Sequence, residues 1–77
     1  MAVGFVLINI APQHETEVYR KLTKIAEIIE VHPLFGEYDL IAKIEAENFE
    51  EMGQLVVNKI RSIKGVLNTK TMTGTNF

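Results

Sequence analysis

The stretch of sequence that decides the fold is Val3-Gly4-Phe5-Val6-Leu7-Ile8-Asn9-Ile10. It is rich in β-branched residues, and its apolar side chains fall on both alternating faces of a strand. A strand with two apolar faces is typical of a sheet centre that is covered on both sides. Because Pro12 then ends the strand, we expect a central strand here with both of its faces covered.

The next segment has the spacing of a short amphipathic helix. From about His14 to Thr23, apolar residues recur at helical intervals: Val18, Leu22 and Ile25. The stretch Ala26–His32 also fits a continued helix, so periodicity alone does not assign it. Its β-branched content and the Pro33 that follows favour a strand.

A turn leads into a third strand. Leu34-Phe35-Gly36-Glu37 has the composition of a turn, and Tyr38–Ala46 then alternates in strand fashion. One face of this strand would carry four residues: Tyr38, Leu40, Ala42 and Ile44.

The second helix has the clearest start signal in the chain. Asn48 suits the N-cap, and Glu51 follows at the spacing of a capping box. The expected core stripe is Phe49, Met52, Leu55, Val56, Ile60 and Ile63. Gly65 supplies a left-handed stop, after which Val66–Gly74 forms the last strand.

The resulting order is βαββαβ, which is the ferredoxin-like arrangement of the α+β class. Its first and third strands are central, and both helices cover the same face. The first strand nevertheless offers apolar residues to both faces, so we expect a second copy to bury the other one.

Composition limits the possible functions. The sequence has 77 residues, a net charge of −2 and no cysteine, so we expect a single domain over residues 1–77. Thiolate metal sites and thiol nucleophiles are excluded, and the absence of a basic cluster argues against direct binding of nucleic acid. No apolar stretch is long enough to span a bilayer, which favours a cytoplasmic protein without a membrane partner. We also expect no cofactor.

The only aspartate of the chain lies in the string Gly36-Glu37-Tyr38-Asp39. A flexible glycine followed by exposed backbone N–H groups can bind a carboxylate, and an adjacent short carboxylate can bind an ammonium group. Together these features suit a free amino acid. The alternative is a turn in which Asp39 only accepts hydrogen bonds from local backbone groups, and the residues alone leave both interpretations open.

Threonines alternate near the C-terminus, at Thr69, Thr71, Thr73 and Thr75. On a strand the first three share one face, where a row of hydroxyl groups can bind a polar ligand or a second chain. Threonine is also common in edge strands, so the row does not by itself indicate a site.

The string Gly36-Glu37-Tyr38-Asp39 before an apolar strand, and the helix from Asn48 to Gly65, resemble the effector domain of the leucine-responsive regulator (Lrp/AsnC) family. This domain is called RAM, for regulation of amino acid metabolism. The resemblance covers Val3 to about Thr73 and implies a strand at Ala26–His32. Family members usually carry an N-terminal helix-turn-helix that binds DNA. Because the first strand here follows Met1 at once, the chain resembles a stand-alone RAM module.

The resemblance implies dimerisation through the sheets into an αβ-barrel, assembly of dimers into an octamer or decamer, and binding of a free amino acid in clefts between dimers. Gly36, Tyr38 and Asp39 match the effector-loop motif, and Thr71 and Thr73 fall on the last strand, which contributes to such clefts. We expect Asp39 to pair with the ligand ammonium, the backbone around Gly36 and Glu37 to receive its carboxylate, and Tyr38 to pack at the rim. Any regulatory output would pass through a partner, such as a full-length Lrp/AsnC regulator.

Two other functions fit the same element order. An ACT-like amino-acid-binding domain places a glycine after its first strand, where this chain has Ile10-Ala11-Pro12-Gln13. A small dimeric αβ-barrel enzyme of the monooxygenase or isomerase type needs polar groups inside the sheet cavity, for which Asn9 and His32 are the candidates. His14 and His32 have no metal-ligand spacing, so we expect no catalytic residue, no metal and no enzyme activity.

Overall fold

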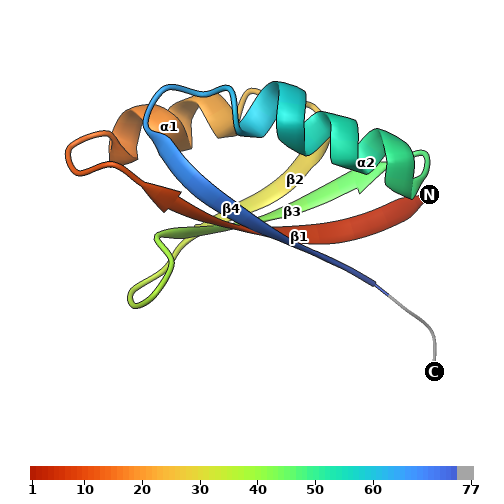
Figure 1. Cartoon of the computed structure of the whole chain (residues 1–77), viewed down its shortest axis with the longest axis horizontal. Helices are drawn as coiled ribbons and strands as arrows, with labels where there is room; N and C mark the ends of the chain where they lie inside the picture. The colour runs from red at the N-terminus through yellow and green to blue at the C-terminus, as the bar shows by residue number, and fades with distance from the viewer. Residues whose placement is uncertain (75–77) are drawn as a thin grey trace.

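In the computed structural model, residues 1–74 are described, and the elements follow the expected order. They are β1 (Ala2–Ile10), α1 (Glu15–Leu22), β2 (Ile28–Pro33), β3 (Leu40–Ala46), α2 (Phe49–Leu55), the π-helical segment η1 (Val56–Ile60) and β4 (Val66–Thr73). The strands form one antiparallel sheet in the order β2-β3-β1-β4. Both helices lie on one face of it (Figure 1). The predicted ferredoxin-like fold is confirmed.

β1 lies between β3 and β4, as its two apolar faces predict. Gly4, Val6 and Ile8 face the helices and are buried, whereas Phe5 and Leu7 alternate with them and face away. The helix-facing residues join one core cluster with the buried residues of β3, α1, α2 and η1. The core of the chain therefore lies entirely between the sheet and its helices.

α2 approaches β1 closely at Gly4. A Cβ atom at this position would lie 2.6 Å from Sδ of Met52, well inside van der Waals contact. The absence of a side chain at Gly4 therefore makes room for the Met52 thioether, which is itself buried. Close packing of Met52 against the backbone at Gly4 therefore fixes how near the second helix lies to the central strand.

The second helix begins as predicted but ends earlier. The side chain of Asn48 accepts a hydrogen bond of 2.8 Å from the N–H of Glu51, which satisfies one free donor of the first turn. The helix then widens into η1 and ends at Ile60 instead of Gly65. Gly65 has the predicted positive φ, at +102°, but it lies in the turn before β4.

The wider η1 turn explains how the core stripe stays buried. Met52, Val56 and Ile60 are four residues apart, and an α-helix repeats every 3.6 residues, so such a stripe would drift around a regular helix. The larger turn of a π-helix compensates for this drift, and all three residues are buried. The prediction for Phe49 is wrong, because its side chain lies on the first turn of α2 and is 59% exposed.

Two strands begin later than predicted. β2 starts at Ile28 instead of Ala26, because residues 26 and 27 form a turn and the N–H of Ile28 donates to the carbonyl of Ile25. β3 starts at Leu40 instead of Tyr38, so Tyr38 and Asp39 belong to the preceding loop. β2 and β4 are the edge strands, and each pairing has a register shift, between Ile28 and Glu30 and between Asn9 and Ile10.

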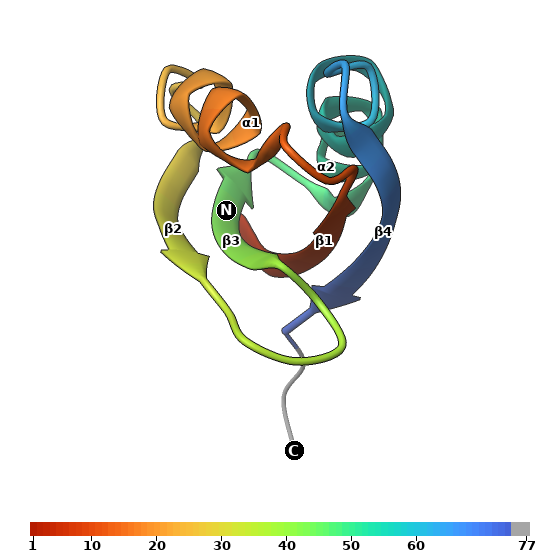
Figure 2. The ribbon, with the colours of Figure 1, turned by 90° about the vertical axis from the view of Figure 1, so that its left-hand side faces the viewer.

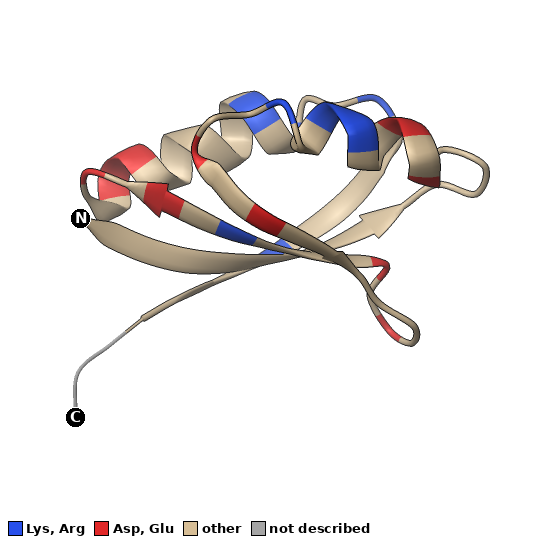
Figure 3. Cartoon of the chain, turned by 180° about the vertical axis from the view of Figure 1, so that it is seen from behind, with Lys and Arg blue, Asp and Glu red and all other residues tan. Residues whose placement is uncertain are grey.

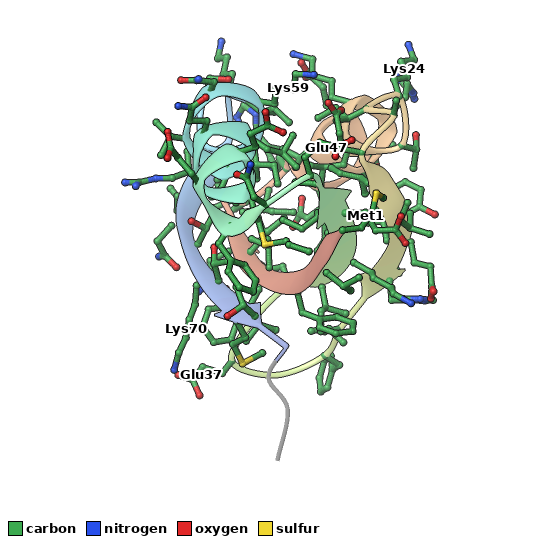
Figure 4. The ribbon with its side chains drawn as sticks, turned by 90° about the vertical axis from the view of Figure 1, so that its right-hand side faces the viewer. Met1, Lys24, Glu37, Glu47, Lys59 and Lys70 are labelled. Atoms are coloured by element: carbon green, nitrogen blue, oxygen red, sulfur yellow. The ribbon has the colours of Figure 1, made fainter. Side chains whose placement is uncertain are left out.

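The sheet face away from the helices is not covered by residues 1–74 (Figure 2). We call it the open face. Its centre is apolar and consists of Val3, Phe5, Leu7, Ile41 and Met72. Its rim is polar and consists of Asn9, Glu30, His32, Lys43, Glu45, Asn68 and Lys70. Figure 4 shows Lys70 and Glu37 on this side of the sheet, with Lys24 and Lys59 on the helix side.

Candidate functional site

The loop of residues 34–39 joins β2 to β3 and projects beyond the sheet on the open-face side (Figures 1 and 2). It is closed by a 2.8 Å hydrogen bond from the N–H of Leu34 to the carbonyl of Asp39. Gly36 has φ +140°, a conformation that residues with a side chain rarely adopt. Phe35 is fully exposed, at 107% of its reference area. Gly36 thus lets the loop reverse direction, and Phe35 at the tip of the loop is exposed to solvent.

The backbone of this loop has unused donors. The N–H groups of residues 35–38 donate no hydrogen bond to any group of the described chain. Adjacent free N–H groups in a turn attract anions. They occupy the place around Gly36 and Glu37 where the sequence predicts a carboxylate to bind. Tyr38 is half-buried beside them.

Asp39 fastens the loop to the end of β1. Its N–H donates to the carbonyl of Ile8 at 3.0 Å, and its carboxylate Oδ2 accepts from the N–H of Ile10 at 2.7 Å. Asp39 therefore accepts a backbone hydrogen bond, but from a donor 29 residues away and not from the local turn that one interpretation of the sequence expects. The second oxygen, Oδ1, has no partner within residues 1–74, so the half-buried carboxylate keeps acceptor capacity for a ligand.

Asp39 also lines a groove of about 420 Å³, which we call the loop groove. Its walls are Ile10, Glu15, Thr16, Tyr19, Pro33, Leu34, Asp39 and Leu40. Its size is within the range of small-molecule sites. Gly36, Glu37 and Tyr38 belong to the adjoining loop and are not among the lining residues.

The three α1 residues of the loop groove were missed by the sequence analysis. A signal was present, because Glu15 and Tyr19 are four residues apart and so share one face of a helix. The sequence did not show that this face would meet the loop before β3. The contact between this face of α1 and the loop before β3 depends on the position of α1 on the sheet, which the sequence alone does not give.

A second groove, of about 400 Å³, lies at the opposite end of the sheet; we call it the terminal groove. It is lined by Met1, Ala26, Glu27, Ile29, Glu45, Ala46, Glu47, Glu51 and Leu55. Glu27 is paired with Lys59, whose Nζ lies 3.1 Å from Oε2. A hydrogen bond from its own backbone and the Lys59 ammonium lower the pKa of Glu27. None of the predicted site residues lines this groove.

The threonine row lies on β4, across β1 from the strand that follows the loop. Thr69, Thr71 and Thr73 pair with Ile8, Val6 and Gly4, so they share one face as predicted. Their partners Val6 and Gly4 lie two and four residues from Ile8, whose carbonyl binds Asp39, or about 7 and 13 Å along a strand. β4 also lies across β1 from β3, the strand that the loop leads into. A single chain therefore does not bring Thr71 and Thr73 to Asp39. Thr75 lies outside the described residues.

Asn9 and His32, the two polar residues considered for an enzyme cavity, each contact another polar residue on the rim of the open face. The side-chain amide of Asn9 donates to Oδ1 of Asn68 at 3.2 Å. His32 Nε2 lies 2.9 Å from Oε1 of Glu30, and this contact lowers the pKa of Glu30.

Within residues 1–74 no group of three or more His, Asp or Glu side chains is arranged to hold a metal ion. None of the helices in the same range has the length and apolar character needed to cross a membrane.

Comparison with known proteins gives the family. Residues 3–75 match the family described as the Lrp/AsnC ligand binding domain. The chain belongs to this family. It is 44% identical over 72 residues to an uncharacterized HTH-type transcriptional regulator of Pyrococcus furiosus, and the match covers 90% of this chain and 48% of that protein. This Lrp/AsnC domain therefore spans about half the length of that relative.

Solved structures agree with the family. The crystal structure of FFRP-DM1 has a TM-score of 0.93 and 35% identity, and the match covers 97% of this chain and all of that one. A transcriptional regulator from Neisseria meningitidis in complex with L-methionine has a TM-score of 0.88 over 97% of this chain and 50% of its own. At 17% identity, the second likeness shows the fold alone.

The names of the relatives fit a chain that is not an enzyme, because several of them are transcriptional regulators. One match is to a homocitrate synthase of Sulfurisphaera tokodaii, at 40% identity over 58 residues. It covers 75% of this chain but only 12% of that protein, so it concerns a small part of the enzyme.

Proposed function

We propose that this Lrp/AsnC domain is a non-enzymatic module that binds a free amino acid, associates with further copies, and modulates transcription regulation without binding DNA itself. The observation that carries the proposal is the loop of residues 34–39. It offers free backbone N–H groups beside a half-buried carboxylate with one unused oxygen. An amino acid has the two matching groups, a carboxylate and an ammonium.

In the proposed complex, Oδ1 of Asp39 accepts from the ligand ammonium, and the N–H groups around Gly36 and Glu37 donate to its carboxylate. Tyr38 packs at the rim, and the apolar walls of the loop groove receive part of the ligand side chain. The named complex of the Neisseria meningitidis regulator with L-methionine supports an amino acid as the ligand class.

We further propose that a second copy covers the open face and forms a dimeric αβ-barrel, from which octamers or decamers are built. An apolar centre with a polar rim of both charge signs is the usual anatomy of a protein interface. In such an assembly another copy would have to bring Thr71 and Thr73 near the loop. Ligand shifts the assembly only if it binds one oligomeric form more tightly than another.

The regulatory output would pass to a partner, such as a full-length Lrp/AsnC regulator that shares this domain. The net charge of −2 gives the chain no general attraction for the phosphate backbone of DNA. Mixed assemblies with a DNA-binding relative would connect the ligand to a promoter.

Isothermal titration with the twenty amino acids tests the site. We expect at least one to bind wild-type protein, and Asp39→Asn to weaken that binding by about tenfold or more, equivalent to about 1.4 kcal/mol. Asparagine is the informative variant because its amide oxygen can still accept from the N–H of Ile10. If no amino acid binds wild type, or if Asp39→Asn binds equally well, the proposed site is wrong.

Light scattering with and without the bound amino acid tests the assembly. We expect a mass of at least two chains in the absence of ligand. A monomer at all concentrations, with or without ligand, would contradict the proposed association while leaving the titration result intact.

A further inference from the structure

The loop groove has an unbalanced charge. Glu15 and Asp39 are the only charged residues that line it, and no lysine or arginine does. Figure 3 shows acidic positions in the first turn of α1 and in the loop before β3, at the same end of the molecule. The two carboxylates therefore face one groove from two separate elements.

Neither carboxylate is neutralised by the described chain. The ion pairs within residues 1–74 use other glutamates, namely Glu17 with Lys21, Glu27 with Lys59, and Glu30 with His32 and Lys43. The terminal groove differs in this respect, because Glu27 in its wall already has Lys59 as a partner. In the loop groove, the exposed Glu15 and the half-buried Asp39 both lack a cationic partner within residues 1–74, so both are available to a cationic ligand.

Asp39 and Glu15 have separate tasks if the ligand is an amino acid. The ammonium group that pairs with Asp39 neutralises one negative charge, and the loop N–H groups take the ligand carboxylate. Glu15 then remains as an unpaired carboxylate in the wall of the same groove. A ligand with a second positive charge would neutralise it.

The surroundings of Glu15 suit an organic cation. Tyr19 lies one helical turn along α1 from Glu15 and lines the same groove. A cation placed between a carboxylate and an aromatic face gains from both. The walls formed by Ile10, Pro33 and Leu40 are apolar and match the aliphatic stem of a long basic side chain.

We propose that the loop groove selects an amino acid whose side chain ends in a cation, as in lysine, ornithine and arginine. Glu15 and Tyr19 are the specificity-determining residues, and Asp39 binds the α-ammonium. This inference rests on the proposed function, since it needs the loop of residues 34–39 to hold the backbone end of the ligand.

The test compares lysine with norleucine, which has a side chain of the same carbon length but no terminal amine. By isothermal titration we expect wild-type protein to bind lysine about tenfold more tightly, the combined size of an exposed ion pair and a cation–π contact. Glu15→Gln should reduce this preference about threefold or more. Tyr19→Leu, added to Glu15→Gln, should reduce the preference for lysine further. Raising the salt concentration should reduce it as well, because the ion pair is exposed.

Two variants are matched controls. Glu17→Gln changes a glutamate of the same helix that is exposed and paired with Lys21, outside the groove. Glu47→Gln changes a glutamate of the terminal groove. Both should keep the wild-type preference for lysine, and circular dichroism should show that all variants fold.

The outcomes separate the two proposals. Equal binding of lysine and norleucine, or a preference that survives Glu15→Gln and Tyr19→Leu, overturns the selectivity and leaves the amino-acid site in place. A preference lost in Glu47→Gln instead of Glu15→Gln also overturns it, because the cation would then lie in the other groove. If no amino acid binds wild type, the proposed function itself fails.

Discussion

The helix-covered face and the open face of the sheet are built from alternate residues of the same strands. On β1, Val6 and Ile8 are fully buried under the helices. Phe5 lies on the opposite face of the same strand, and its side chain is 40% exposed. Both faces have an apolar centre. Only one of them finds its cover within the described chain.

The difference shows that apolar residues on both faces of a strand predict that both faces are buried, but not whether the same chain or another molecule covers each face. The first face is completed by intramolecular packing, so its stability should not depend on protein concentration. The second face is left uncovered by residues 1–74, and in the proposed dimer another copy covers it, so its contribution should depend on concentration.

The largest effect is expected for Ile8→Ala on the helix face. Ile8 is fully buried among the core residues, and its truncation leaves a cavity. We expect a loss of about 2–5 kcal/mol in the free energy of unfolding, measured by urea denaturation. Leu7→Ala, one residue away on the open face, should cost far less in dilute solution. Equal losses would mean that the two faces are not distinct.

Gly4→Ala should be the next most damaging change. The new methyl group would meet Met52 Sδ, and overpacking of this kind costs about 1–3 kcal/mol. Gly53→Ala is the matched control, because a Cβ atom there meets nothing within 4 Å and alanine favours a helix. The thermal midpoint should fall for the first variant and stay level or rise for the second. A level midpoint in both would show that Met52 moves aside without penalty.

Leu7→Lys tests the open face. A charge at its apolar centre should raise the dissociation constant between copies about tenfold or more, equivalent to about 1.4 kcal/mol, with little change in the unfolding of dilute protein. Asn68→Lys places the same charge on the rim and should have a smaller effect. Analytical ultracentrifugation measures both. An assembly unaffected by Leu7→Lys would mean that the copies meet elsewhere.

The smallest effect concerns acid pH. A backbone hydrogen bond and Lys59 lower the pKa of Glu27 on the helix side, and a hydrogen bond with His32 lowers that of Glu30 on the open face. A carboxylate with a lowered folded-state pKa stabilises the fold at neutral pH, and this contribution is lost as pH falls through the folded-state value. Urea denaturation between pH 7 and pH 3 should therefore show a slightly smaller loss for Glu27→Gln than for wild type. An identical slope in both would contradict the assigned pairing.

Much of the fold could be predicted because local patterns and global structure agree. The two apolar faces of β1 placed it at the sheet centre, and Asn48 with Glu51 marked the helix start. The end of that helix could not be predicted, since a π turn depends on how Met52, Val56 and Ile60 fit the core beneath them. The candidate site was predicted only in part for a related reason. The loop residues are contiguous in sequence, whereas Ile10, Glu15 and Tyr19 meet Asp39 only through tertiary structure.

The two edge strands have a consequence for how this sheet can grow. β2 ends in Pro33, which has no N–H to offer a neighbouring strand, and β4 carries the charged side chain of Lys70. The pairings of both strands also slip out of regular register, which twists an edge away from a flat template. Addition of strands edge to edge, the route to open-ended fibrils, is therefore discouraged on both sides. In the proposed dimer the flat of the sheet, and not either of its edges, is therefore the surface that meets a second copy.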